Sequence, residues 1–275
     1  MEDTRIAIIG CGNMGRSLIG GLIANGLASQ FLSGADPDPG KRGQIAKQYG
    51  IAVFADNREA VSRVDVVVLA VKPQIMQATA VSLRNAVLGK GCLIISVAAG
   101  IRLSALAAWL GDAAAIVRVM PNTPAIIQTG ASALYANSCV TPAQKETAEA
   151  IMRSVGTAIW LADELMMDAV TALSGSGPAY FFLVMEIMEK AAISLGMTQN
   201  QAHLLTLETA FGAAKMALES SCDAATLRAQ VTSPGGTTER ALNVLLEGGI
   251  ESLFRAALEA ARDRSVELAE TLGKP

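Results

Sequence analysis

The feature that most restricts the fold of this chain is a glycine-rich turn close to its first residue. A four-residue apolar run, Ile6-Ala7-Ile8-Ile9, leads directly into the turn Gly10-Cys11-Gly12-Asn13-Met14-Gly15, and the stretch from Arg16 to Ala24 has a helical pattern. A strand, a G-x-G-x-x-G turn and a helix in this order are typical of the first βαβ unit of a dinucleotide-binding domain.

The three glycines of this turn have separate predicted roles. Gly10 permits the tight turn, Gly12 lets a pyrophosphate approach the backbone, and Gly15 lets the helix pack on the strand. Asn13 and Met14 belong to the same turn and are counted with the glycines as cofactor-binding residues. The alternative is a glycine turn that holds no ligand.

Asp36 is the candidate for contact with the ribose of the cofactor. It follows Gly15 by about 20 residues, near the end of the predicted second strand, where an acid accepts hydrogen bonds from the ribose 2′-OH of NAD. Lys41 and Arg42 come soon after, and they could instead neutralise the 2′-phosphate of NADP. The sequence therefore leaves both NADH and NADPH possible as cofactors. The alternative is that this segment is a turn-rich loop with solvated charges and no contact to a cofactor.

Composition favours an enzyme of the cell interior. With 275 residues and 51% hydrophobic content, the chain can form one or two domains with sizeable cores. A net charge of −3 offers no basic surface for nucleic acid. Glu186, Glu189 and Lys190 interrupt the most apolar stretch, and no signal peptide precedes the first strand. We expect a cytoplasmic protein without a membrane span.

The cysteines and the histidine predict no metal centre. Cys11, Cys92, Cys139 and Cys222 are widely scattered, which favours reduced, buried thiols over a disulfide scaffold or a C-x-x-C metal site. His203 is the only histidine and lies in a helical stretch, so a structural role and no Ser-His-Asp triad are expected.

Apolar runs and helical patterns alternate up to about residue 162. The clearest predicted strands are Val64 to Val71, Cys92 to Val97, Ile116 to Met120, Ala131 to Tyr135 and Thr157 to Leu161. Such alternation implies an α/β fold with a mostly parallel sheet covered on both faces. After Asp163 only helical periodicity remains. We therefore predict a Rossmann NAD(P)-binding domain over residues 1–162 and an all-α domain over residues 163–275.

Three predicted strands end in loops of small residues and prolines. The loops are Lys72-Pro73, Ala98-Ala99-Gly100 and Pro121-Asn122-Thr123-Pro124. Ligands of open α/β sheets bind at the carboxyl ends of the strands, so these loops would form a flat wall for a nicotinamide ring. Lys72 either contacts the cofactor or lies in solvent.

Two further segments in the second half favour a small polar substrate. Ser174 and Ser176, within Ser174-Gly175-Ser176-Gly177-Pro178, could donate hydrogen bonds to it; alternatively Ser176 caps a helix that has Pro178 near its first position. Val231 to Thr238 contains Gly235-Gly236 followed by two threonines at a predicted helix start. The free N–H groups there would bind a carboxylate or phosphate; the alternative is an ordinary turn with a threonine cap.

Together these motifs resemble those of the pyrroline-5-carboxylate reductases, over essentially the whole chain. The two segments of the second half are the most diagnostic, because other nucleotide-binding reductases lack them. The matching motifs are Ile9 to Gly15, Ala70-Val71-Lys72-Pro73, Val97-Ala98-Ala99-Gly100, Met120-Pro121-Asn122-Thr123-Pro124, Ser174 to Ala179, and Val231 to Thr238.

The resemblance implies NAD(P)H-dependent reduction of 1-pyrroline-5-carboxylate to L-proline. The N–H groups of Gly236, Thr237 and Thr238 would hold the substrate carboxylate, the Thr238 hydroxyl would bond the ring nitrogen, and Ser176 would help to orient the ring. By the same resemblance, Asn57 would contact the adenosine half of the cofactor. The nicotinamide half would be lined by Ala70, Val71, Lys72, Pro73, Ala98, Ala99 and Gly100.

The resemblance also implies a homodimer built by interlocked helical domains, which in relatives often assembles further into decamers. One departure is Ser221, where many relatives carry an acidic residue close to the substrate amine. Two other functions stay open: a reductase of another small imine or 2-keto acid, and a nucleotide-binding sensor without turnover.

Overall fold

The computed structural model describes residues 3–273, which form two compact units. Unit 1 comprises residues 3–176 together with residues 260–273, and unit 2 comprises residues 177–259. The last strand ends at Trp160, two residues before the predicted boundary at Ala162. The chain therefore leaves unit 1 after Ser176 and returns to it at Ala260. The sequence-based boundary at Ala162 stays a prediction.

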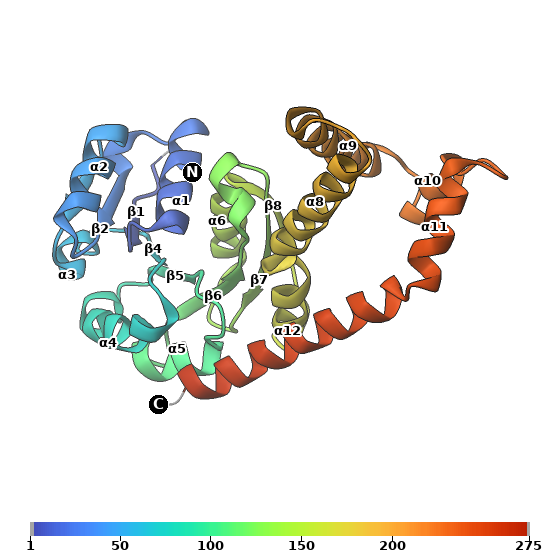
Figure 1. Ribbon diagram of the computed structural model, residues 1–275. Helices are drawn as coiled ribbons and strands as arrows, with labels where there is room; N and C mark the ends of the chain where they lie inside the picture. Colours follow the sequence, from blue (N-terminus) through green and yellow to red (C-terminus); the bar gives the residue numbers. More distant parts are fainter. Residues whose placement is uncertain (1–2, 274–275) are drawn as a thin grey trace. The chain divides into compact units, whose positions relative to one another are not determined.

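Unit 1 is built on an eight-stranded sheet with the order β3-β2-β1-β4-β5-β6-β7-β8 (Figure 1). All neighbouring strands are parallel except β6 and β7. The prediction of a mostly parallel α/β sheet is confirmed. The strands are β1 (Ile6–Ile9), β2 (Leu32–Ala35), β3 (Ala52–Phe54), β4 (Val66–Leu69), β5 (Leu93–Ser96), β6 (Ala115–Met120), β7 (Gly130–Ala136) and β8 (Gly156–Trp160).

Helices and short helical turns connect the strands of unit 1. The helices are α1 (Asn13–Ala24), α2 (Pro39–Tyr49), α3 (Asn57–Ala60), α4 (Met76–Val87), α5 (Leu103–Leu110), α6 (Pro142–Arg153) and α7 (Met166–Val170). The 3₁₀ turns are Ser29–Phe31, Pro73–Ile75 and Thr123–Ile127. Thr141 opens α6 with a capping box: its hydroxyl accepts the N–H of Gln144, and the Gln144 side chain accepts the N–H of Thr141.

The central strands of the sheet are buried on both faces. Along β1, Ile6 and Ile8 point into one apolar cluster, whereas Ala7 and Ile9 point into the other. Residues of α1, α2 and α6 complete the first cluster, and residues of α3, α4 and α5 complete the second. Strands covered on both sides explain the nearly continuous apolar runs in the sequence.

Polar contacts join the segments that follow β8 to the rest of unit 1 and to one another. Nη1 of Arg118, which is 3% exposed in β6, lies 2.7 Å from Oε1 of Glu164. The same Glu164 oxygen accepts the N–H of Leu103 at the start of α5. Further on, the Ser265 hydroxyl of α12 (Ile250–Leu272) donates to Asp168 of α7 at 2.6 Å, and both residues are buried.

The segment between α7 and α8 (Gly177–Ser194) stays helical. Thr171–Gly175 forms a π-helical turn, and Ser176 has helical angles of φ −86° and ψ −21°. The interpretation of Ser176 as a helix cap is therefore wrong, because a cap residue needs extended angles. The resulting helix, Met166–Ser194, is long and apolar enough to cross a membrane by length and composition alone.

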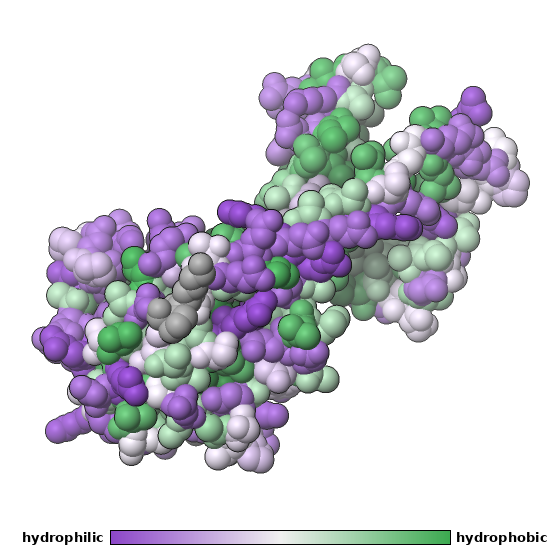
Figure 2. Space-filling model, turned by 90° about the horizontal axis from the view of Figure 1, so that it is seen from below, coloured by the Kyte–Doolittle hydropathy of each residue, from purple (hydrophilic) through white to green (hydrophobic). Residues whose placement is uncertain are grey.

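Unit 2 contains only helices within residues 177–259. They are α8, α9 (Gln199–Glu219), α10 (Ala224–Gln230), α11 (Thr237–Glu247) and the first part of α12. Within α8 and α9, the buried residues are Gly177, Ala202 and Thr206. Large apolar side chains are instead exposed, and green hydrophobic atoms gather along α8 and α9 in Figure 2.

Candidate functional site

The loops that were predicted to bind the cofactor lie next to one another at the carboxyl edge of the sheet. Backbone hydrogen bonds join them in sequence: Gly10 N–H to Ala35 C=O at 2.8 Å, Ala70 N–H to Ile9 C=O at 2.8 Å, and Val97 N–H to Leu69 C=O at 3.1 Å. Strand β1 has β2 on one side and β4 on the other, so the direction of the strand order changes here. Open α/β sheets bind ligands at such a switch point.

The glycine turn has the geometry that the sequence predicts. Gly10 has φ +99°, and a Cβ added there would lie 2.6 Å from the Ala70 carbonyl oxygen. A Cβ on Gly15 would lie 2.0 Å from the Gly10 oxygen, so α1 packs directly on the turn. A Cβ on Gly12, by contrast, would meet nothing within 4 Å. The open space over Gly12 leaves room for a pyrophosphate at the start of α1, which Asn13 and Met14 begin.

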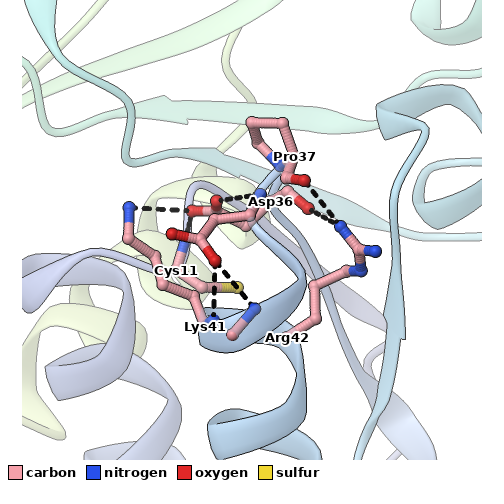
Figure 3. A network of polar contacts seen from close by, with 7 residues as sticks. Cys11, Asp36, Pro37, Lys41 and Arg42 are labelled. Carbon is pink, nitrogen blue, oxygen red and sulfur yellow. Dashed lines mark hydrogen bonds and ion pairs between the residues drawn. The ribbon is translucent and has the colours of Figure 1, made fainter.

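Asp36 is engaged with the glycine turn. Its Oδ2 accepts the N–H of Cys11 at 2.9 Å, and its Oδ1 accepts the N–H of Asp38 at 3.0 Å (Figure 3). The residue is only 5% exposed. An ionised carboxylate has about four lone-pair sites, so two remain after these bonds. Asp36 therefore links the end of β2 to the turn that follows β1.

Lys41 and Arg42, the two basic residues beside Asp36, make different contacts. Nζ of Lys41 lies 3.7 Å from Oδ2 of Asp36, with its side chain about half exposed. Arg42 instead donates through Nη1 to the carbonyl oxygens of Asp36 and Pro37, each at 2.8 Å (Figure 3). Lys41 thus brings a positive charge to the rim of the candidate ribose site, whereas Arg42 holds the loop.

The thiol of Cys11 is held in its neutral form. Burial, and secondly the charge of Asp36, raise the pKa of Cys11 to about 11. A thiol with this pKa is protonated at neutral pH and is a poor nucleophile. Cys11 and Cys92 are buried as expected, but the expectation for all four cysteines is wrong, since Cys139 is exposed and Cys222 is partly exposed.

The other predicted cofactor residues occupy the same edge. Asn57 opens α3 directly after β3, whose Phe54 pairs with Ala35 of β2. Lys72 is solvent-exposed, and Pro73 beside it starts a 3₁₀ turn. Ala70 and Val71, which follow β4, are partly exposed. After β5, Ala98 and Gly100 are buried and Ala99 is partly exposed.

The Ser174–Ser176 segment is also part of unit 1, and the loop after β6 supports it. The Ser174 hydroxyl donates to the Val170 carbonyl at 3.1 Å, so its remaining capacity is to accept hydrogen bonds. The side-chain amide of Asn122 donates to the Ser174 carbonyl at 3.1 Å. Sequence reasoning placed Asn122 in a cofactor loop and missed this contact.

The predicted anion site begins α11 in unit 2. Gly235 is left-handed with φ +71°, and Gly236 is an extended N-cap without a side chain. The N–H of Gly236 donates to the Ser233 carbonyl, and the N–H of Gly235 donates to Glu239 Oε2 at 2.7 Å. The next two N–H groups, those of Thr237 and Thr238, point out of the first turn, where a helix has no internal acceptor for them.

His203 has a structural contact, as expected. Its Nδ1 lies 2.9 Å from Oε1 of Glu189, which joins α9 to α8. Among residues 3–273, no three His, Cys, Asp or Glu side chains come together as a metal site would require.

Comparison with protein families covers both halves of the chain. A family model described as pyrroline-5-carboxylate reductase dimerisation matches residues 164–268. A second model, described as NADP oxidoreductase, coenzyme F420-dependent, matches residues 5–100. The first match includes the helices with exposed apolar side chains, and the second includes the glycine turn.

Individual relatives match over the full length. The chain is 52% identical to the pyrroline-5-carboxylate reductase of Pseudomonas aeruginosa, with 100% of both chains covered, and 39% identical to that of Escherichia coli, with 99% of both covered. A solved pyrroline-5-carboxylate reductase from Coxiella burnetii has a TM-score of 0.94 and 44% identity, covering 97% of this chain and 99% of its own. A Plasmodium falciparum pyrroline carboxylate reductase with NADP bound has a TM-score of 0.87 and 28% identity, covering 98% and 99%.

Proposed function

This chain belongs to the pyrroline-5-carboxylate reductase family and is an NAD(P)H-dependent oxidoreductase of proline biosynthesis, and we propose which residues hold its two reactants. The glycine turn of unit 1 holds the dinucleotide. The first turn of α11 in unit 2 holds the carboxylate of 1-pyrroline-5-carboxylate. The open space over Gly12, beside two further strand exits, is the observation that carries the proposal.

The dinucleotide pyrophosphate lies over Gly12 at the start of α1, where Asn13 and Met14 add backbone N–H groups. Asp36 uses its remaining lone pairs for the ribose hydroxyls, and Lys41 at 3.7 Å offsets its charge when a 2′-phosphate is present. This arrangement supports the use of both NADH and NADPH. Asn57 contacts the adenosine half of the dinucleotide.

The nicotinamide half lies against the exits of β4 and β5. The lining residues are Ala70, Val71, Lys72, Pro73, Ala98, Ala99 and Gly100. Apart from Lys72, these residues have small or rigid side chains that leave a flat surface on which a planar ring can rest. The bond from the Val97 N–H to the Leu69 carbonyl keeps the two loops together.

The substrate carboxylate accepts hydrogen bonds from the N–H groups of Thr237 and Thr238, strengthened by the positive end of the helix dipole. Gly236 contributes by the absence of a side chain, because its own N–H is bonded to Ser233. Thr238 directs its hydroxyl to the ring nitrogen, and Ser174 and Ser176 orient the ring.

When bound, NAD(P)H would supply the hydride that reduces the imine carbon. The carbon–nitrogen double bond becomes a single bond, and the nitrogen keeps the proton that an imine takes up before it reacts. The protein therefore needs groups that position the imine and stabilise its N–H, and it needs no strong general acid. The hydroxyl of Thr238 would accept the hydrogen bond from this N–H.

Initial rates test this proposal. With 1-pyrroline-5-carboxylate present, oxidation of NADPH or NADH is expected to depend on the imine. Thr238→Ala should lower kcat/KM by about tenfold to a hundredfold, because one hydrogen bond to a charged group is lost. The exposed Thr226 of α10 provides the matched control, since Thr226→Ala removes the same hydroxyl elsewhere in unit 2. Unchanged turnover in Thr238→Ala would exclude the role of that hydroxyl.

The dimerisation region makes the protein a homodimer. We propose that these dimers assemble further into decamers, which the amount of exposed apolar surface on unit 2 supports. Light scattering after size exclusion distinguishes a dimer from a tenfold assembly. We also propose a cytoplasmic location, which the free thiols of Cys11 and Cys92 support.

A further inference from the structure

The loop after β6 and the Ser174–Ser176 segment meet within unit 1. The side chain of Asn122 has two backbone partners: its Oδ1 accepts the N–H of Ala131 in β7 at 2.8 Å, and its Nδ2 donates to the Ser174 carbonyl at 3.1 Å. Only the amide oxygen can accept a hydrogen bond from an N–H, and only the amide nitrogen can donate one to a carbonyl. These two partners therefore fix the orientation of the Asn122 amide. One end of the side chain is therefore held by the sheet, and the other holds the serine segment.

The sequence explains why the Ser174 carbonyl needs this donor. In an α-helix it would accept the N–H of the residue four positions later, and that residue is Pro178, which has no N–H. The π-helical turn at Thr171–Gly175 shifts the neighbouring bonds, as the bond from Ser176 N–H to the Thr171 carbonyl at 2.9 Å shows. An amide from outside the helix supplies the donor that proline removes.

A second contact from the same loop supports the segment. A Cβ on Gly175 would lie 2.4 Å from the Met120 methyl carbon, so the Met120 side chain is seated where Gly175 has none. Met120 and Asn122 thus contact consecutive residues of the segment from the exit of β6. Neither contact was evident from the motif itself.

We propose that Asn122 is a positioning residue that holds Ser174 and Ser176 in place for the substrate. This inference rests on the proposed substrate role of the two serines. Asn122 acts through them and does not itself touch the reacting atoms. Loss of the Nδ2 donor lets the serine segment shift, which weakens substrate binding, while the glycine turn and the exits of β4 and β5, where the proposed dinucleotide contacts lie, are retained.

Asn122→Asp is the first test, because it keeps an oxygen for Ala131 and places an acceptor against the Ser174 carbonyl. The KM for 1-pyrroline-5-carboxylate should rise about tenfold, the factor that corresponds to one lost hydrogen bond. The Kd for NADPH, measured by fluorescence titration, should stay within about twofold. If the aspartate variant does not fold, Asn122→Ala removes the donor without adding a charge. It should likewise raise the KM for the imine and leave the Kd for NADPH within about twofold.

Asn137 provides a matched control. Its amide also joins two backbone groups, accepting the N–H of Ile116 at 3.1 Å and donating to the Ala114 carbonyl at 2.8 Å, at the opposite end of β6. Asn137→Asp should lower the stability of the sheet to a similar degree and leave the KM unchanged. An equal rise in KM for both variants would mean that Asn122 has only a structural role.

A mutant cycle with the two serines separates the positioning role from an independent one. If Asn122 acts through the two serines, adding Asn122→Asp to a variant that carries both Ser174→Ala and Ser176→Ala should raise the KM by less than about twofold further. A full tenfold effect in both backgrounds, or a parallel loss of NADPH affinity, would overturn the inference. If Ser176→Ala alone leaves the KM unchanged, the proposed role of Ser176 fails first.

Discussion

The two units of this molecule differ in whether their large apolar side chains are buried or exposed. In unit 1 the large apolar residues of β1, β4 and β5 are buried on both faces of the sheet. In unit 2, Phe181, Phe182 and Phe211 are each more than 60% exposed. A helix that is apolar all round needs a partner to cover it. Unit 1 completes its core within one chain, whereas unit 2 lies in the region that matches the dimerisation model, and we expect a second copy to cover its apolar side chains.

The largest expected effect comes from a charge in unit 2. Phe182→Glu places a carboxylate on an apolar surface that we expect the dimer to bury, so dimer affinity should fall by about a hundredfold or more. Size exclusion with light scattering measures the loss, and activity should fall with it. Val81→Glu is the control, because Val81 is 53% exposed on α4 of unit 1. An intact dimer in Phe182→Glu would contradict this division of the two units.

A pair of leucine substitutions sharpens the comparison. Leu83→Ala, at a fully buried position of α4, should cost about 2–5 kcal/mol of unfolding free energy through loss of packing. Leu204→Ala, at a 59% exposed position of α9, should act mainly on assembly. Unfolding at several protein concentrations tests this. The effect of Leu204→Ala should grow as the protein is diluted, and that of Leu83→Ala should not.

The smallest expected effect is confined to the cofactor. Asp36→Ala leaves the Cys11 N–H without its acceptor, so binding of both dinucleotides should weaken by about tenfold. NADH should lose more than NADPH, because the 2′-phosphate does not require an acidic partner. Titration with each cofactor measures the ratio, and dimer mass should stay unchanged. An unaltered ratio would show that Asp36 supports the glycine turn without contacting the ribose.

How far the sequence predicts this molecule depends on whether a contact is local. The glycine turn, the capping box at Thr141 and the parallel sheet follow from short patterns, because the residues that interact are near one another along the chain. The bond from Asn122 to Ser174 spans 52 positions and leaves no periodic signal. A proline four residues after Ser174 was the available sign that a donor would be needed there.

The same limit applies to Ser176 and to Asp36. The Ser-Gly-Ser-Gly-Pro sequence suggests a break in the helix, but the π-helical turn accommodates Pro178 and the helix continues. Asp36 lies at the predicted position of a ribose-binding acid, and its bond from the Asp38 N–H is local. Its bond from the Cys11 N–H spans 25 positions and depends on the pairing of β1 with β2, which no short pattern indicates.

The return of α12 to unit 1 bears on how the chain is made. Leu272 packs against the apolar cluster of α4 and α5, Leu268 lies beside Gly100, and Ser265 bonds Asp168. These residues leave the ribosome after the whole of unit 2. The core of the dinucleotide-binding unit is therefore completed only after unit 2 has been synthesised, so unit 2 is made while unit 1 is still incomplete.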